Sequence, residues 1–462
     1  MSIVPTVNAG PRLDRLPISG FHRRLLCLIG AGVFVDAFDV YLAGGAMAKM
    51  VDEAFSTIDA NAGFLSAGFA GMLFGALIAG LVGDRFGRRY SYQFNLLIFG
   101  LASLGAVFAP SIETLTVLRF MMGIGLGAEV VVASGALLEF IPPSHRGRSM
   151  ALLAIIINSG FLASTVVGYF VIPAFGWRWM FAIAGLGALA VWVARKGMPE
   201  SPRWLESVGR KEEAEQALAA IEATVQKERG ALPPVAGVER ASPARVPVSA
   251  LFASTLLPRT ILGALIAIST LAAVFNFILW LPTFMVKEGL SVVESLGFSM
   301  AISLGAPLGG VVAFWIADRV PRKQSLVATS VSIVVLGTIY PTLESNAVIL
   351  IVGFALVTAI YALVALGVYT YVPELFPTAI RLRGTGFCSL CGRAASIAMP
   401  FAAVVAYRNA GLTGVLMIVC GLLVLLIGAV LVVNVETLSR PLEDIGGAGD
   451  AIGSDAAPKP DH

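Results

Sequence analysis

The sequence predicts an all-α membrane protein with twelve transmembrane helices in two pseudo-symmetric halves of six helices each. Composition is the first observation behind this prediction. Hydrophobic residues make up 57% of the 462 positions and charged residues only 13%, whereas roughly a quarter of the residues of a soluble domain are charged. The second observation is that two motifs recur in one register, 234 and 235 residues further along the chain. Such a repeat indicates one structural unit written twice.

The membrane-spanning segments follow from length, because a helix needs about 20 apolar residues to cross the hydrocarbon core. Six candidates precede a long polar loop and six follow it. They are residues 25–47, 60–82, 91–109, 114–140, 147–172, 177–196, 259–284, 292–317, 325–343, 347–372, 384–407 and 411–433.

These segments divide the chain into five parts. An N-terminal tail (1–24) precedes the first half (25–196), a central loop (197–258) joins it to the second half (259–433), and a tail (434–462) follows. The loop should contain a short amphipathic helix near 212–221, and the polar tail should be largely disordered. Lys and Arg gather in the loops of one face, so both termini are predicted to be cytoplasmic.

The repeated motifs fall in the loops of that basic face. Residues 83–89 (GDRFGRR) return as 317–323 (ADRVPRK), and Glu139 with Arg146 returns as Glu374 with Arg381. An Asp at a helix end can pair with an Arg of a neighbouring helix in one conformation and release it in another. Plain topological anchoring is the alternative, but repetition of the Asp favours a cytoplasmic gate between the halves. The predicted gate residues are Asp84, Arg85, Arg88, Glu139, Arg146, Asp318, Arg319, Arg322, Glu374 and Arg381.

On these motifs, on Arg119 followed by Gly123, Gly125 and Gly127, and on the twelve-segment layout, the chain resembles the major facilitator superfamily. The Asp-Ala-Phe-Asp sequence at 36–39 is similar to the paired-Asp motif of the aromatic acid:proton symporters, although Ala37 stands where Gly is usual. The segments 280–283 and 392–393 are also similar to that group and to the metabolite:proton symporters. The cytoplasmic motifs are similar to those of sugar porters, which keeps a sugar or polyol porter as the alternative.

Charged residues inside the first half are predicted to couple transport to protons. Asp36 and Asp39 share a helix face, and a carboxylate at the bilayer centre costs a few kcal/mol unless it serves a function. A structural hydrogen-bonding pair is the alternative for them. Arg119 either neutralises one of these acids or fixes helix packing through backbone carbonyls. Glu129, ten residues further along, has either a coupling or a packing role.

The second half contains one deeply placed base, Arg393. A guanidinium beside a central cavity suits a substrate carboxylate, since the two groups have matching bidentate geometry. Pairing with Asp36 or Asp39 across the halves is the alternative. The neutral candidates for the cavity wall are Asn158, Asn276, Trp280, Tyr41, Tyr361 and Tyr369, although aromatic residues are also common at lipid-facing positions.

Together these features predict a symporter that imports a small organic acid, preferably an aromatic carboxylate, with a proton as the coupling ion. It should work as a monomer in the bacterial inner membrane, with membrane lipid around it, no cofactor and no nucleic-acid partner. A non-transporting membrane sensor is a more distant alternative, because no output domain is evident. The sequence contains no nucleophile and base pair, phosphate loop or metal cluster, so an enzyme is not expected.

Overall fold

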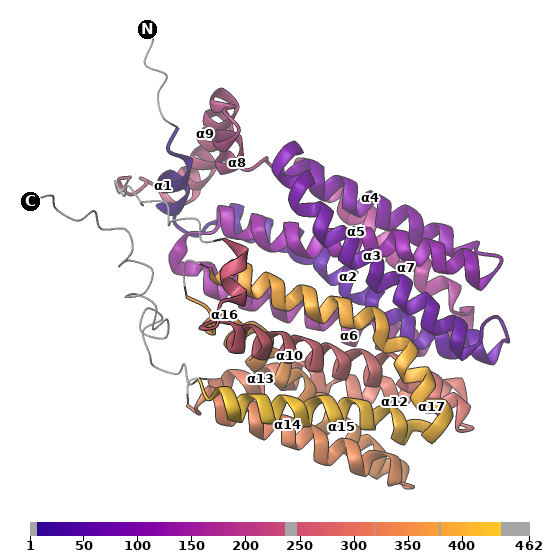
Figure 1. Cartoon of the computed structure of the whole chain (residues 1–462). Coiled ribbons are helices and arrows are strands. Elements are labelled where there is room, and N and C mark those ends of the chain that lie inside the picture. Colours follow the sequence, from indigo (N-terminus) through magenta and orange to yellow (C-terminus); the bar gives the residue numbers. More distant parts are fainter. Residues whose placement is uncertain (1–6, 236–246, 318, 378–379, 436–462) are drawn as a thin grey trace, which may run out of the picture. The chain divides into compact units, whose positions relative to one another are not determined.

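The computed structural model describes residues 7–235, 247–317, 319–377 and 380–435, without the side chains of 80–84, 130, 131, 134 and 382. Within this part every regular element is a helix, which confirms the predicted all-α fold (Figure 1). The chain forms two compact units. Unit 1 comprises Met1–Ala241 with Leu281–Met300, and unit 2 comprises Ser242–Trp280 with Ala301–His462.

The long helices of unit 1 carry the first six predicted segments. The helices of this unit are α1 (Ala9–Asp14), α2 (Gly20–Asp52), α3 (Ile58–Phe86), α4 (Arg88–Val107), α5 (Ile112–Phe140), the short 3₁₀ turn η1 (Pro143–His145), α6 (Arg146–Phe175), α7 (Arg178–Ala194), the short 3₁₀ turn η2 (Arg195–Gly197), α8 (Pro202–Ser207), α9 (Lys211–Arg229) and α11 (Leu281–Lys287). Helix α12 (Val292–Ser303) crosses the division between the units.

Unit 2 carries the remaining long segments. Besides two short 3₁₀ helices (Val248–Phe252 and Tyr340–Thr342), its helices are α10 (Leu257–Ala273), η4 (Val274–Leu279), α13 (Gly305–Ala317), α14 (Arg322–Ile339), α15 (Asn346–Leu363), η6 (Val364–Tyr371), α16 (Val372–Glu374) and α17 (Arg381–Val433). The two η segments are π-helical and continue α10 and α15. Such π segments are rare and often lie at functional sites. Asn276 and Tyr369, both predicted cavity residues, lie in them.

All twelve predicted segments are helical. Among the described residues, nine helical runs are long and apolar enough to cross a membrane. One of these runs is α17, which contains two predicted segments and breaks at Ala410 and Gly411. Helices α4 and α5 coincide with two further segments but are not among the nine.

Local chemistry sets several of the helix boundaries. The Ser111 side chain accepts a hydrogen bond from the backbone N–H of Thr114 at the start of α5, 3.4 Å away, and so caps that helix. Between α3 and α4 the chain turns at Gly87, which has a φ of 100°. This left-handed conformation strains any residue with a Cβ, so glycine suits the turn.

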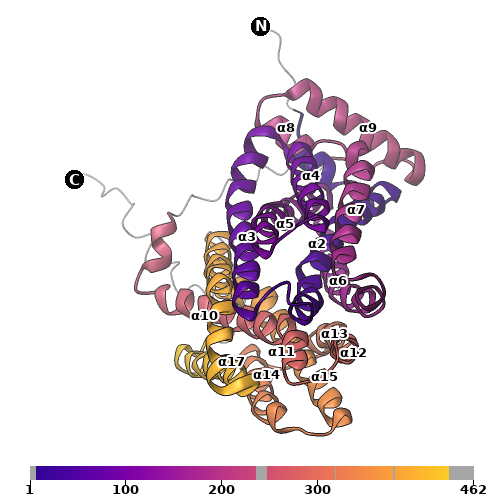
Figure 2. The same ribbon diagram turned by 90° about the vertical axis from the view of Figure 1, so that its right-hand side faces the viewer.

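Helices α3 and α5 pack through a seam of glycines. A Cβ on Gly71 or Gly75 of α3 would collide with backbone atoms of α5, and a Cβ on Gly123 or Gly127 would collide with backbone atoms of α3. Figure 2 shows α5 with α2, α3 and α4 around it. The small residues of α5 therefore permit the close helix approach expected from the sequence, and α3 is the partner.

The structure adds detail to two parts of the chain, residues 281–300 and the central loop. Residues 281–300 group with unit 1, where α11 packs on α2 and Leu296 contacts Gly45. The predicted amphipathic helix in the central loop is α9, whose apolar face is buried through Ala214, Leu218 and Ile221. The predicted disordered tail lies outside the described residues from position 436 onward.

Candidate functional site

Asp39 and Arg119 form a buried ion pair inside unit 1. Arg119 Nη1 lies 2.5 Å from Asp39 Oδ2, and Arg119 Nη2 donates to the backbone carbonyl of Asp39 at 3.3 Å. Asp39 is 0% exposed and Arg119 is 4% exposed. The guanidinium also lies over the ring of Phe64, 5.3 Å from its centre. Of the two roles considered for Arg119, this geometry matches neutralisation of an acid of the first segment, with one backbone contact in addition.

Glu129 pairs with Arg195, a residue that sequence reasoning did not single out. Arg195 Nη1 contacts Glu129 Oε1, and each residue is 1% exposed. Arg195 also donates to two backbone carbonyls of α2, from Nε to Leu28 at 2.8 Å and from Nη2 to Ile29 at 2.9 Å. A guanidinium has five N–H donors, so Arg195 can make these three contacts at once. Arg195 thus joins η2, α5 and α2 at one point.

Gly32 makes room for this second pair. A Cβ built on Gly32 would collide with Arg195 Nη2, and it would lie 2.7 Å from Arg195 Cζ and 2.7 Å from Glu129 Oε1. The guanidinium therefore reaches the backbone of α2 only because position 32 has no side chain. Nothing in the sequence pointed to this pair, because Arg195 precedes Lys196 at the end of an apolar segment, as topological anchors do.

Asp36 is buried without a partner. Asp36 is 4% exposed, and both of its carboxyl oxygens lack a hydrogen bond among the described residues. The charges that act on it are those of Glu129, Arg195 and Asp39. A buried ionised carboxyl without hydrogen bonds is strongly unfavourable, so a proton on the carboxyl is the simplest way to stabilise it. The structure thus separates the two predicted acids into one paired and one unpaired group.

The other predicted cavity residues of unit 1 lie on α2 and α6. The Tyr41 ring lies 4.5 Å from the ring of Phe161, measured between centroids. Asn158 is partly accessible on α6. The contacts of these two side chains fix no chemical role.

In unit 2, Arg393 lies on α17 and is partly accessible. Tyr369 in η6 lies near it, and Tyr369 is 63% exposed. Among the described residues no acid lies within ion-pair distance of Arg393. Asn276 in η4 is buried; its Nδ2 lies 3.4 Å from Met399 Sδ, and its Oδ1 has no partner in this part of the chain. Trp280 and Tyr361 are also buried.

The repeated motifs form equivalent contacts in the two units. In unit 1, Arg88 Nε lies 3.1 Å from Glu139 Oε1. In unit 2, Arg322 Nε lies 3.2 Å from Glu374 Oε2. Each residue of the second pair lies 234 or 235 positions after its counterpart, so the internal repeat extends to side-chain pairing.

The second motif gives a matching result. Arg146 Nε donates to the Ile141 carbonyl at 3.0 Å, and Arg381 Nε donates to the Phe376 carbonyl at 3.3 Å. Arg319 lies over the ring of Trp315, 4.9 Å from its centre. Arg85 likewise lies over Phe86. The Asp84 side chain and Asp318 lie outside the described residues, and pairing between the halves stays a prediction.

Two acids of this network were not predicted. Asp14 Oδ1 accepts from Arg146 Nη2 at 2.9 Å and from Arg203 Nη2 at 2.6 Å. Glu200 accepts the backbone N–H groups of Arg88 at 2.9 Å and Arg89 at 3.1 Å. Burial raises the pKa of Glu200, against the lowering effect of these N–H groups. A carboxylate at the N-terminus of α4 is also stabilised by the helix dipole.

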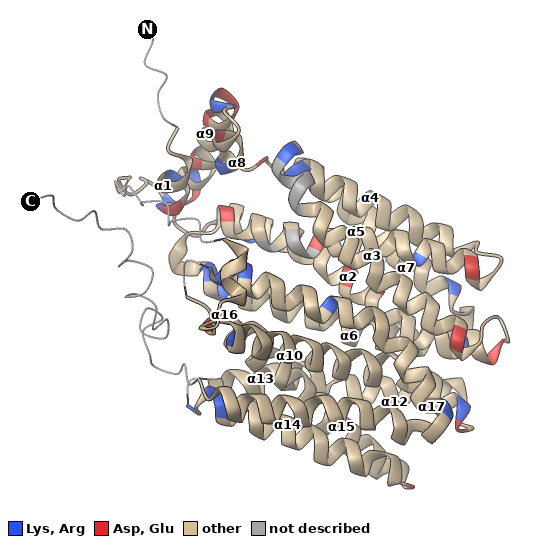
Figure 3. Ribbon diagram, in the orientation of Figure 1, with Lys and Arg blue, Asp and Glu red and all other residues tan. Residues whose placement is uncertain are grey.

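Helix α1 is held to α9 by ion pairs. Arg12 lies 2.6 Å from both Glu215 and Glu222, and Arg15 lies 2.7 Å from Glu222. Burial opposes ionisation of Glu222, but the two arginines outweigh it, and the pKa of Glu222 lies below its usual value. Figure 3 shows that α1 and α9 carry basic and acidic residues, while most of each long helix carries neither.

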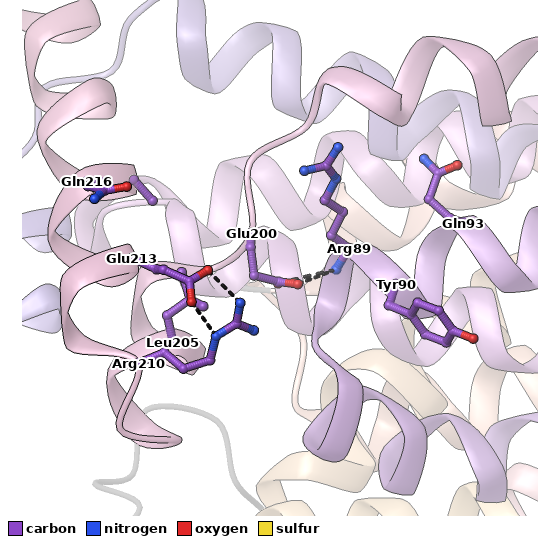
Figure 4. Close-up of a pocket in the computed structure, with 9 residues that line it drawn as sticks. Arg89, Tyr90, Gln93, Glu200, Leu205, Arg210, Glu213 and Gln216 are labelled. Carbon is purple, nitrogen blue, oxygen red and sulfur yellow. Dashed lines mark hydrogen bonds and ion pairs between the residues drawn. The ribbon is translucent and has the colours of Figure 1, made fainter.

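A pocket of about 600 Å³ opens beside this network in unit 1. Figure 4 shows Glu200 reaching the backbone of Arg89 and Arg210 paired with Glu213, 2.7 Å apart. The pocket is lined by Arg89, Tyr90, Gln93, Glu200, Leu205, Arg210, Glu213, Gln216 and Ala217. None of these belongs to the predicted coupling or substrate residues, so this pocket is distinct from the predicted transport site.

Comparisons with known proteins agree over nearly the whole chain. The family model described as "Sugar (and other) transporter" matches residues 27–448. The inner membrane metabolite transport protein YdjE of Escherichia coli is 35% identical over 442 residues, which cover 94% of this chain and 98% of YdjE. The niacin transporter NiaP of Acinetobacter baylyi is 33% identical over 445 residues, covering 94% and 99%.

A solved structure has the same fold. The xylose transporter XylE from E. coli, in a partially occluded inward-open conformation, has a TM-score of 0.72 with 19% sequence identity. The match covers 92% of this chain and 100% of that chain. At this level of identity the match concerns the fold alone.

Proposed function

The chain belongs to the sugar (and other) transporter family of the major facilitator superfamily, and from this premise we propose that it is a proton-coupled symporter for a small organic acid. It is a multi-pass membrane transporter of metabolites and not an enzyme. The observation that carries the proposal is the buried, unpartnered carboxyl of Asp36 beside the ion pair of Asp39 and Arg119.

Proton coupling needs a group that gains and loses a proton as the protein changes conformation. Asp39 has a counter-ion in Arg119, 2.5 Å away. Asp36 has no hydrogen-bond partner among the described residues, and its burial makes its neutral form favourable. Access of water to Asp36 in the outward-open or inward-open state would load or release the proton.

Charge also supports the choice of an organic acid as substrate. The partly accessible Arg393 has no described acid within ion-pair distance, and a guanidinium binds a carboxylate with two parallel hydrogen bonds. The exposed ring of Tyr369 nearby suits a planar substrate. The niacin transporter NiaP, a relative at 33% identity, is named for an aromatic acid. We therefore propose an aromatic carboxylate such as nicotinate or a hydroxybenzoate.

The proposed transporter works as a monomer by alternating access in a bacterial inner membrane. Two relatives from E. coli, YdjE and YgcS, are named as inner membrane metabolite transport proteins. The ends of the helices that carry Arg88 with Glu139 and Arg322 with Glu374 would then face the cytoplasm, with both chain termini, because basic residues concentrate on that side.

Uptake into proteoliposomes tests this function. Nicotinate, hydroxybenzoates and xylose are offered with the outside buffer more acidic than the inside, and again without a gradient. We expect gradient-driven accumulation of an aromatic acid. Asp36→Asn should abolish accumulation but leave exchange of substrate across the membrane, whereas Asp59→Asn, at an exposed position of α3, should leave both accumulation and exchange intact.

Substrate charge is tested in unit 2. Arg393→Gln should reduce acid uptake at least tenfold, because loss of one charge-assisted pair costs about 1.5–3 kcal/mol. Arg408→Gln, at an exposed position of the same helix, is the matched control. Uptake of a neutral sugar without any gradient would refute the proposal and favour the sugar or polyol porter instead.

A further inference from the structure

The buried charges of unit 1 do not balance. Among its described residues, five Asp, Glu, Lys or Arg side chains are buried: Asp36, Asp39 and Glu129, and the two bases Arg119 and Arg195. Three carboxylates against two guanidiniums leave one negative charge in excess. Because an isolated buried charge is far more costly than a protonated acid, neutrality of this group takes one proton.

The geometry of α2 places this proton between the two ion pairs. Gly32, Asp36 and Asp39 follow one another at spacings of four and three residues, so they lie along one face of the helix. Gly32 faces Arg195 and Glu129, while Asp39 is paired with Arg119. Asp36 therefore lies about one helical turn, roughly 5 Å along the axis, from each pair.

The groups facing Asp36 come from three elements. Glu129 on α5 and Arg195 in η2 act on it most strongly, followed by Asp39 on α2 itself. Helices α3, α6, α7, α9 and α11 also pack on α2 but contribute no charge to those acting on Asp36 within the described residues. Arg195 is the base that acts on Asp36, and it is already paired with Glu129.

We propose that Asp36, Glu129 and Arg195 form a triad that carries one exchangeable proton per transport cycle, with Glu129 acting as a positioning residue that keeps Arg195 away from Asp36. This inference rests on the proposed proton symport. Glu129 occupies the guanidinium, which leaves the carboxyl of Asp36 without a counter-ion and free to take up a proton. If Glu129 were neutral, Arg195 would be the counter-ion of Asp36 and would hold it ionised.

The charge count makes the test sharp. Glu129→Gln leaves two acids and two bases, so the group is neutral without a proton, and gradient-driven accumulation should fall to the equilibrium level although Asp36 is intact. The double variant Glu129→Gln with Arg195→Gln restores an excess of one acid, and accumulation should return. Counterflow exchange and thermal stability of each variant show that the protein is folded and binds substrate.

The same proteoliposomes measure the number of protons. One proton taken up with one monovalent anion moves no net charge, so each unit of pH difference should give about tenfold accumulation, and an imposed membrane potential should have no effect. Wild-type protein that accumulates about a hundredfold per pH unit, or responds to potential, overturns the single-proton assignment.

The outcomes distinguish failure of the proposed symport from failure of the proposed triad. If the wild-type protein shows no proton-driven uptake of any acid, the proposed symport itself is wrong. If the wild type accumulates substrate but Glu129→Gln does so equally well, or the double variant remains uncoupled while folded and exchanging, symport stands and the triad is refuted. Uncoupling in the single variant with recovery in the double variant supports the triad.

Discussion

Replacing Gly32 by Ala tests whether the Glu129–Arg195 pair depends on the missing side chain. The added Cβ would collide with Arg195 Nη2 and would lie 2.7 Å from Glu129 Oε1. The helix of α2 is fixed by its own backbone hydrogen bonds, so the guanidinium must move. Its hydrogen bond to the Ile29 carbonyl, now 2.9 Å, and its contact with Glu129 would then be lost or stretched.

The magnitude follows from the burial of the pair. Breaking a buried ion pair costs about 3–5 kcal/mol, and the change from Gly to Ala in a helix returns up to about 1 kcal/mol. The net loss of stability for Gly32→Ala is therefore about 2–4 kcal/mol. Gly421→Ala is the matched control, because Gly421 lies in the long helix α17 with nothing within 4 Å of an added Cβ.

Thermal unfolding of purified protein in detergent measures the effect. Gly32→Ala should melt about 2–4 °C below the wild type, whereas Gly421→Ala should melt at or slightly above it. Gly32→Ala should also lose proton-driven accumulation, since a displaced Arg195 becomes available to Asp36. A Gly32→Ala protein as stable and as well coupled as the control would show that the close approach at position 32 is not what holds Arg195 in place.

Three further changes test other contacts. Arg119→Gln leaves Asp39 buried without its counter-ion and should cost about 3–5 kcal/mol; adding Asp39→Asn should recover most of the lost melting temperature, and no recovery would argue against the pair. Gly127→Ala pushes a Cβ into the backbone of Met72 and should lower stability by about 1–3 kcal/mol, measured in the same way. Because the pKa of Glu222 is below its usual value, docking of α1 on α9 should be complete above about pH 4.3 and lost as the pH falls through the lowered pKa. In hydrogen exchange, Glu222→Gln should expose α1 already at neutral pH. An unchanged exchange pattern would contradict a role of these ion pairs in holding α1.

Much of the fold was predictable because hydropathy is a property of whole segments. Each of the twelve predicted segments is helical, and the repeated motifs form the pairs of Arg88 with Glu139 and of Arg322 with Glu374 in equivalent places. A repeat preserves local geometry, so a contact within one unit predicts its counterpart in the other.

The candidate site was predictable only in part. Asp36, Asp39 and Arg119 stood out because charges are rare in apolar segments, and the pairing of Arg119 with an acid of the first segment was one of two interpretations of the sequence. Arg195 did not stand out, since a base at the end of an apolar segment usually anchors the topology. Its burial becomes evident only when α5 and η2 are placed around Gly32.

The amino-acid sequence by itself determined the membrane-spanning helices, the doubled architecture and the residue types available for coupling, because these depend on composition and spacing along the chain. Tertiary structure alone decided which charges are paired. Asp39 and Arg119 are 80 residues apart, and Glu129 and Arg195 are 66 residues apart. An ion pair forms over a few ångströms, and only the packing of α2, α5 and η2 brings these groups within that reach and leaves Asp36 without a partner among the described residues.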